Sequence, residues 1–141
     1  MAGQTMTLQI ITPEGPVLQD VATEAVVVPV VGGEMGILYN HAPMVAALRI
    51  GVLRYKQGET FKRVAVSGGF MEVSNNRVTV LADTAEPGET IDVLRAQEAR
   101  KRAERRLRER AANIDRARAE AALQRALARL KAAGALDEEK R

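Results

Sequence analysis

The strongest constraint on the fold is an abrupt change of composition near residue 90 of this 141-residue chain. All five prolines, ten of the eleven glycines and all four aromatic residues precede residue 91, whereas alanine, arginine, glutamate and leucine dominate the remainder. Charge changes at the same place, because residues 1–90 carry six Lys/Arg against nine Asp/Glu and residues 91–141 carry fifteen against nine. Such a division is typical of two structural units with separate tasks, and we divide the chain into residues 1–86 and 87–141.

Residues 1–86 are predicted to form an antiparallel β-sandwich, or flattened barrel. Short runs rich in Val, Ile and Leu alternate with turn signals at close intervals, without helical periodicity between them. Gln57–Glu59 and Ser74–Asn76 each separate two such runs, which is typical of β-hairpins. The apolar stretch 24–31 predicts a strand buried on both faces or close to it, and Pro29 within it predicts a sheet edge or a bulge.

Residues 87–141 are predicted to form an antiparallel hairpin of two helices. Thr90 or Asp92 can cap the first helix, and Asn113–Asp115 interrupts the helical pattern with residues that favour caps. Because the apolar stripes consist largely of alanine, each contact buries little area, and we expect the hairpin to pack weakly. The expected stripes are Ala99, Ala103, Leu107 and Ala111, followed by Ala119, Leu123, Ala126, Leu127 and Leu130.

The composition argues against several kinds of catalytic and metal chemistry. Without cysteine the chain has no disulfide, thiolate nucleophile or cysteine-ligated zinc site. Its single histidine, His41, cannot build a multi-histidine metal site. Gly32–Gly36 lacks the lysine and the following helix of a phosphate-binding loop. The apolar run Ala25–Val31 is far too short to span a bilayer, and the N-terminus lacks a secretory signal, so we expect a cytoplasmic protein without an evident active site.

The twelve arginines beyond residue 90 allow more than one interpretation. The simplest is an ordinary solvated helical face. Nucleic-acid binding is disfavoured because the basic half has no aromatic residue for stacking and contains nine acidic residues. A membrane-surface helix is disfavoured because its apolar face would be mostly alanine. A basic helical adaptor for an acidic protein or a nucleic acid remains an alternative function.

A family resemblance rests on four segments and on their order along the chain. The segments are Thr12–Gly15, Gly33–Pro43, Val66–Val73 and Ile91–Ala96. The glycine-rich loop that ends in His-Ala-Pro and the Ser-Gly-Gly-Phe segment are distinctive together. With these segments the chain resembles the epsilon-subunit family of bacterial F-type ATP synthases over nearly its whole length. One departure is Tyr-Asn at residues 39–40, where the family usually has Pro-Gly. Asparagine tolerates left-handed backbone geometry, so we expect the turn to survive.

The resemblance implies a β-sandwich that binds the gamma subunit and the c-ring of a proton- or sodium-translocating synthase and turns with its rotor. It implies a helical hairpin that permits ATP hydrolysis when folded on the sandwich and inhibits it when extended into the alpha/beta hexamer. The chain would then be a non-catalytic regulatory subunit, peripheral to the cytoplasmic face of the bacterial cell membrane. The rotor interface expected on this basis consists of Glu34, Met35, Gly36, Ile37, Leu38, His41, Ala42 and Pro43.

The resemblance also implies that ATP binds the folded hairpin as a regulatory ligand, with no metal required. Some family members bind ATP through the pattern Ile/Leu-Asp-x-x-Arg-Ala, which is intact at residues 91–96. Arg125 and Arg129 are four residues apart on one helical face, so both guanidinium groups can reach one triphosphate. The alternative is that Asp92 only caps a helix and the arginines are ordinary surface charges. The implied ATP-binding residues are Glu86, Ile91, Asp92, Arg95, Ala96, Arg102, Arg125 and Arg129.

Overall fold

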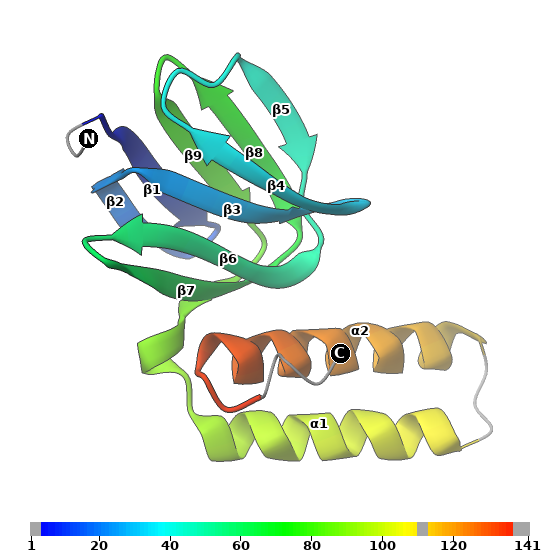
Figure 1. Cartoon of the computed structure of the whole chain (residues 1–141). Helices are drawn as coiled ribbons and strands as arrows, with labels where there is room; N and C mark the ends of the chain where they lie inside the picture. Colours follow the sequence, from blue (N-terminus) through cyan, green and yellow to red (C-terminus); the bar gives the residue numbers. More distant parts are fainter. Residues whose placement is uncertain (1–3, 110–112, 137–141) are drawn as a thin grey trace.

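The computed structural model describes residues 4–109 and 113–136 and shows a β-sandwich joined to a pair of helices (Figure 1). Within these residues the sandwich contains ten strands in two five-stranded sheets. A 3-10 turn, η1 (Gly88–Thr90), leads from the sandwich into α1 (Val93–Arg108), and α2 (Asn113–Ala132) follows. The predicted fold, a sandwich followed by an antiparallel two-helix hairpin, is confirmed.

The two sheets differ in what covers them. The hairpin lies beside one sheet, which we call the helix-facing sheet; α2 contacts its strands β6 and β7, and α1 lies on the far side of α2 (Figure 1). The other sheet is called the distal sheet. The helix-facing sheet has the order β10 (Ala85–Pro87), β7 (Thr60–Ser67), β6 (Ile50–Gln57), β3 (Ala25–Val30) and β4 (Gly33–Leu38). The distal sheet has the order β2 (Gly15–Thr23), β1 (Met6–Thr12), β9 (Arg77–Ala82), β8 (Gly69–Ser74) and β5 (Met44–Ala47).

Strand pairing is antiparallel throughout the described sheets except between β1 and β9, which are parallel. These two strands are far apart in sequence, so no hairpin constrains their direction, and the sequence patterns did not reveal the pairing. Both predicted hairpins, β6–β7 and β8–β9, are confirmed.

The core between the sheets belongs to the sandwich alone. Side chains alternate along the strands, so Met6, Leu8 and Ile10 on β1 are buried while the residues between them are only half-buried. They join one aliphatic cluster with buried residues such as Val26 and Met71, and every described member of that cluster precedes residue 86. Burying an aliphatic side chain of this size contributes about 1.5–3 kcal/mol. The sandwich therefore has a core of its own, to which the described helices contribute no residue.

Strand β3 shows how the sheet accommodates Pro29. Val26 and Val28 are buried and Val27 is half-buried, which confirms the predicted near-complete burial of the strand. Strand β3 pairs with β4 along its whole length but with β6 only at Val26 and Val27. The predicted sheet edge at Pro29 is wrong, because β3 lies between β6 and β4 within the sheet. The proline is tolerated because it lies beyond the β3–β6 ladder, where its carbonyl accepts from the Arg49 N–H at 3.1 Å and no partner requires an N–H from residue 29.

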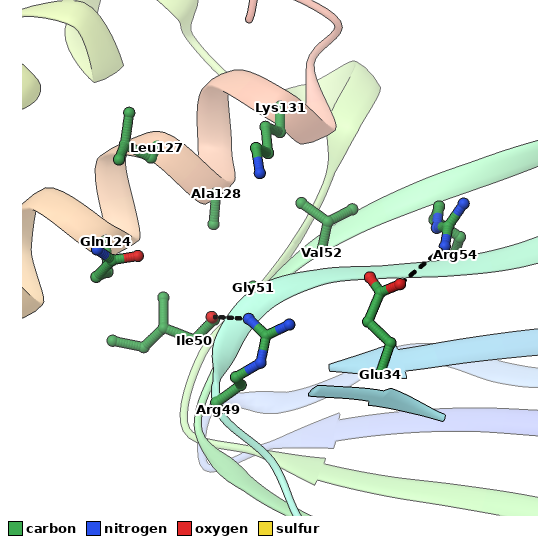
Figure 2. Close-up of a pocket in the computed structure, with 10 residues that line it drawn as sticks. All are labelled: Glu34, Arg49, Ile50, Gly51, Val52, Arg54, Gln124, Leu127, Ala128 and Lys131. Carbon is green, nitrogen blue, oxygen red and sulfur yellow. Dashed lines mark hydrogen bonds and ion pairs between the residues drawn. The ribbon is translucent and has the colours of Figure 1, made fainter. Parts of the chain in front are cut away.

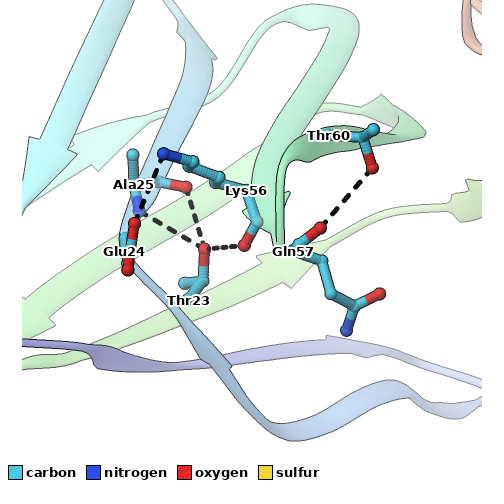
Figure 3. Close-up of polar contacts among 6 residues, drawn as sticks. All are labelled: Thr23, Glu24, Ala25, Lys56, Gln57 and Thr60. Atoms are coloured by element: carbon cyan, nitrogen blue, oxygen red, sulfur yellow. Dashed lines mark hydrogen bonds and ion pairs between the residues drawn. The ribbon is translucent and has the colours of Figure 1, made fainter. Parts of the chain in front are cut away.

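The corner between β2 and β3 is tied to β6 by a buried threonine. Thr23 is 2% exposed, and its hydroxyl lies 2.7 Å from the Lys56 carbonyl oxygen and 3.0 Å from that of Ala25 (Figure 3). The Lys56 ammonium also pairs with Glu24 at 3.3 Å. Both hydrogen-bond partners of Thr23 are backbone carbonyl groups. Thr23 therefore fixes the path of the backbone where the chain passes from the distal sheet to the helix-facing sheet.

The helix boundaries follow local capping chemistry. The Asp92 carboxylate accepts a hydrogen bond from the Arg95 N–H at 3.1 Å and begins α1, as predicted. Thr90 instead donates to the Pro87 carbonyl within η1. The predicted break at Asn113–Asp115 is displaced, because α1 ends at Arg108 and α2 already begins at Asn113. Asp115 lies in the first turn of α2, where a negatively charged side chain is favourable, so these residues begin α2 rather than precede it. Ala111 of the first predicted stripe lies outside the described residues.

Candidate functional site

The contact between the hairpin and the sandwich is small and rich in alanine. Ala128 and Ala132 of α2 pack on Ala65 of β7, and half-buried aliphatic residues surround this contact. Gly88 lies so close to α2 that a Cβ atom on it would come within 2.0 Å of the Ala132 carbonyl oxygen. The helix therefore rests directly on η1 and β7 with little side-chain material between them. The surrounding aliphatic residues are Ile50, Val52 and Ile91.

One ion pair joins α2 to the edge of the helix-facing sheet. The Arg129 Nε atom donates to the Glu86 carboxylate at 2.6 Å, and both side chains are partly exposed. Arg125 lines a small hollow of about 10 Å³ beside this pair. The structure thus brings together three of the predicted ATP-binding residues, Glu86, Arg125 and Arg129. In this arrangement Arg129 is already engaged by a carboxylate.

A second group of arginines surrounds a groove between the two helices. The groove has a volume of about 380 Å³, an alanine floor and four arginines on its walls, and we call it the arginine groove. Arg102 and Arg125 were predicted as ligand residues, and Arg125 lines both the groove and the hollow beside Glu86. Arg106 and Arg118 were missed, although Arg106 lies four residues after Arg102. The groove is lined by Ala99, Arg102, Ala103, Arg106, Arg118, Ala119, Ala121, Ala122 and Arg125.

The remaining predicted ATP-binding residues lie where α1 begins. Ile91 packs against the alanine contact, and Asp92 caps the helix. Ala96 is only 2% exposed, so its methyl group belongs to the packing of the hairpin. Arg95 is exposed. The structure gives Asp92 and Ala96 structural roles, and it leaves the Arg95 side chain accessible to a ligand.

The residues of the predicted rotor interface follow the edge strand β4 and the loop after it. Ile37 is fully buried and Met35 packs against the core, so their side chains fill the sandwich. Leu38 is 61% exposed, and Glu34 pairs with Arg54 at 3.3 Å. The His41 ring lies 2.8 Å from the Ala42 carbonyl oxygen through Nδ1, which orders the loop locally. The accessible part of this segment is therefore its alternate β4 side chains and the loop. Gly36 in β4 and Pro43 in the loop complete the predicted set.

The distal sheet carries an exposed apolar patch that the sequence reasoning missed. Val45, Phe70 and Leu81 are 68%, 58% and 52% exposed. Ala47 pairs with Phe70 and Phe70 with Leu81, so these side chains share the outer face across β5, β8 and β9. The signal was present in the strands, because Phe70 and Leu81 alternate with buried residues and occupy positions where polar residues are usual. We call Val45, Ala47, Phe70 and Leu81 the distal patch.

The described part of the chain contains no cluster of three His, Asp or Glu side chains arranged to hold a metal ion. Neither α1 nor α2, as far as it is described, is long and apolar enough to cross a membrane. What the described hairpin does offer to a ligand is a set of arginine side chains, which suit phosphate and carboxylate groups.

Comparison with known proteins agrees with this architecture. Residues 5–88 match the beta-sandwich domain of the ATP synthase delta/epsilon chain, and residues 89–134 match its long alpha-helix domain. The ATP synthase epsilon chain of Symbiobacterium thermophilum is 71% identical over 135 residues, covering 96% of this chain and 97% of the relative. The ATP synthase epsilon chain of Desulfitobacterium hafniense is 55% identical over 133 residues, covering 94% of this chain and 98% of the relative. A chain in the Euglena gracilis mitochondrial ATP synthase (OSCP/F1/c-ring) superposes with a TM-score of 0.80 at 26% identity, covering 93% of this chain and 82% of that chain. The chain therefore belongs to the ATP synthase delta/epsilon chain family, among relatives that are bacterial epsilon chains.

Proposed function

We propose that the chain is a non-catalytic rotor subunit in the central stalk of a proton- or sodium-translocating ATP synthase, peripheral to the cytoplasmic face of the bacterial membrane. The family membership supports this role, as does the likeness to a chain from an assembly that contains F1 and the c-ring. The sandwich supplies the docking module, because its core is complete without the helices. The gamma subunit and the c-ring are the partners proposed for it.

The distal patch is the surface that we assign to the gamma subunit. An exposed group of large apolar side chains on one sheet face is typical of a protein interface. The helices lie against the opposite sheet, so the patch stays accessible while the hairpin is folded. The loop with His41, together with Leu38 and Glu34 on β4, is proposed to contact the c-ring.

The hairpin is proposed to inhibit ATP hydrolysis when it leaves the sandwich and extends toward the alpha/beta hexamer. The observation that carries this proposal is the alanine contact of Ala65 with Ala128 and Ala132. A conformational switch needs two arrangements of one sequence that differ by only a few kcal/mol, and a contact of small side chains satisfies that requirement. The net positive charge of residues 91–141 suits acidic segments of a partner.

ATP is proposed to stabilise the folded hairpin by binding at the arginine groove and the adjoining Glu86–Arg129 hollow. Arg125 lines both, so a triphosphate along the groove would have guanidinium groups over its whole length. ATP then favours the folded hairpin by the difference between its affinities for the two states. The Glu86–Arg129 pair must open or rearrange if Arg129 is to contact the phosphates.

The inhibitory role is tested with the assembled synthase. A chain truncated after residue 90 retains the sandwich core and is expected to assemble, while ATPase activity rises because the hairpin is absent. The full-length chain provides the reference. Unchanged hydrolysis by a correctly assembled truncated complex, under every nucleotide condition, would refute the inhibitory role.

The ATP site is tested by isothermal titration of the full chain. Arg125→Ala removes a charge-assisted contact and is expected to weaken ATP binding by about 10- to 150-fold, equivalent to about 1.5–3 kcal/mol. Arg118→Ala is expected to weaken it as well if the phosphates lie in the groove. Arg108→Ala is the matched control, because Arg108 is on α1 but does not line the groove. Equal losses in the Arg108 and Arg125 variants would show that ATP responds only to diffuse positive charge.

A further inference from the structure

A second cavity lies between β6 of the sandwich and α2, apart from the arginine groove. It has a volume of about 400 Å³, which is within the range of small-molecule sites (Figure 2). Its two walls come from different units, with Gly51 and Val52 on one side and Gln124 and Ala128 on the other. On the α2 side, Ala128 contributes only a methyl group to the wall.

Arg49 is held in a fixed position at the floor of this cavity. Its Nε atom lies 3.1 Å from the carbonyl oxygens of both Val30 and Gly33, and its Nη1 atom donates to the Ile50 carbonyl at 3.2 Å. A Cβ atom on Gly51 would lie 3.1 Å from Nη1 and 2.8 Å from the Pro29 Cβ, so the absence of a side chain at residue 51 makes room for this guanidinium. Such a cation is organised before any ligand arrives, which lowers the entropy cost of binding.

Lys131 supplies a second cation from the opposite wall. Its ammonium group extends from α2 toward β6 and forms no ion pair or hydrogen bond with the described residues (Figure 2). The carboxylate in the cavity, Glu34, is paired with Arg54 at 3.3 Å, so it neutralises a different cation. The cavity thus carries a net positive charge contributed by both units.

The rest of the lining is suited to an apolar body rather than to a free anion. Ile50, Val52 and Leu127 contribute aliphatic side chains to the lining, and Gln124 adds one amide. A volume of about 400 Å³ also exceeds what a single inorganic phosphate requires. The combination of a positioned guanidinium, an ammonium group and aliphatic walls matches a phosphate ester of an apolar group.

We propose that this cavity binds a small organic phosphate, with the phosphate between Arg49 and Lys131 and the organic group on Ile50, Val52 and Leu127. The site goes beyond the proposed ATP site, because the two share only Ala128 and no charged residue. Since one wall is α2, the ligand binds only while the hairpin is packed on the sandwich. Its binding therefore opposes extension of the hairpin.

The test is a titration of the full chain with phenyl phosphate, followed by amide chemical shifts. Saturable shifts are expected at Gly51, Val52 and Ala128, and inorganic phosphate is expected to bind more weakly because it has no apolar group. Lys131→Gln, which removes one charged contact on an exposed residue, is expected to weaken binding about 10-fold or more. Arg108→Gln is the matched control, because Arg108 lines neither this cavity nor the arginine groove, and it is expected to leave the affinity for phenyl phosphate unchanged. Arg118→Gln reports separately on any binding in the arginine groove.

Three results would overturn the proposal. The first is the lack of any saturable shift around Gly51 at millimolar phenyl phosphate. The second is unchanged affinity in Lys131→Gln together with loss of binding in Arg118→Gln, which would place the anion in the arginine groove. The third is equally strong binding of benzyl alcohol, which would show that the phosphate is not recognised. The proposed ATP site stands or falls separately, on the effect of Arg125→Ala on the ATP titration, because Arg125 does not line this cavity.

Discussion

Replacing Gly88 by alanine is expected to separate the hairpin from the sandwich without disturbing either unit. Gly88 does not have a positive φ, so alanine can adopt its backbone conformation without strain. The added methyl group would instead come within 2.0 Å of the Ala132 carbonyl oxygen and 2.8 Å of its carbonyl carbon. Both atoms are backbone atoms of the last turn of α2, so no side-chain rotation relieves the overlap.

The size of the effect follows from this geometry. Ordinary van der Waals contact begins near 3.4 Å, so the end of α2 must move away by about 1.4 Å. That shift separates Ala132 from Ala65, which is part of the small contact that holds the hairpin. Overpacking of this kind costs about 1–3 kcal/mol. We therefore expect the population of packed hairpin, relative to released hairpin, to fall about 5- to 150-fold.

Hydrogen exchange of the α2 amides measures this population. A released hairpin of two short helices is only marginally stable, so the amides of Ala126–Ala132 are expected to exchange faster by the same factor. Gly36→Ala is the matched control, because no atom lies within 4 Å of a Cβ placed there. Core amides on β1 report the sandwich and are expected to stay protected. Equal protection of α2 in the Gly88 and Gly36 variants would refute the reasoning.

Substitutions at three further positions test the local structure of the sandwich. Thr23→Val removes the donor to the Lys56 carbonyl and is expected to lower the free energy of unfolding by about 1–3 kcal/mol in urea titrations. Asn40 has φ 67°, so Asn40→Ala is expected to cost about 1–2 kcal/mol by the same assay, and Asn40→Gly less. Burial, and then the charge of Glu89, raise the pKa of Tyr55 above 10.0. The contribution of neutral Tyr55 to the free energy of unfolding is complete below pH 10.0 and is lost as the pH rises through the folded-state pKa. Tyr55→Phe is therefore expected to reduce the loss of stability at alkaline pH, followed by circular dichroism.

The parts of the fold that local chemistry determines were predictable from the sequence. Alternating aliphatic runs and turn residues indicated the sandwich. Thr90 or Asp92 was expected to cap the first helix, and the structure assigns that role to Asp92, whose side chain accepts from a backbone N–H three residues away. The turn at Asn40 was also expected, and its φ of 67° is the left-handed conformation that asparagine tolerates. Each of these features depends on neighbours within a few residues.

The features that depend on distant pairing were not predictable. The parallel β1–β9 ladder, the distal patch and the partner of Arg129 all involve residues that only the folded topology brings together. Periodicity identifies which residues share a face, but it does not say whether that face is covered by a helix or left exposed. For the same reason helical spacing placed Arg125 only with Arg129, and its grouping with Arg102 came from the family resemblance, whereas the structure adds Arg106 and Arg118 to the same groove.

The alanine content of the hairpin links its composition to its proposed motion. Each buried methyl group contributes about 0.8 kcal/mol, so the contact of Ala65, Ala128 and Ala132 contributes about 2–3 kcal/mol, before the half-buried residues around it are counted. The partly exposed Glu86–Arg129 pair adds at most about 1 kcal/mol. Leucines at the same positions would contribute more than a ligand or partner could readily offset. A contact of this size is instead comparable to the coupling energies through which ligands shift conformational equilibria, about 1–3 kcal/mol. Because these residues are small, binding of a ligand can shift the equilibrium between the packed and the released hairpin.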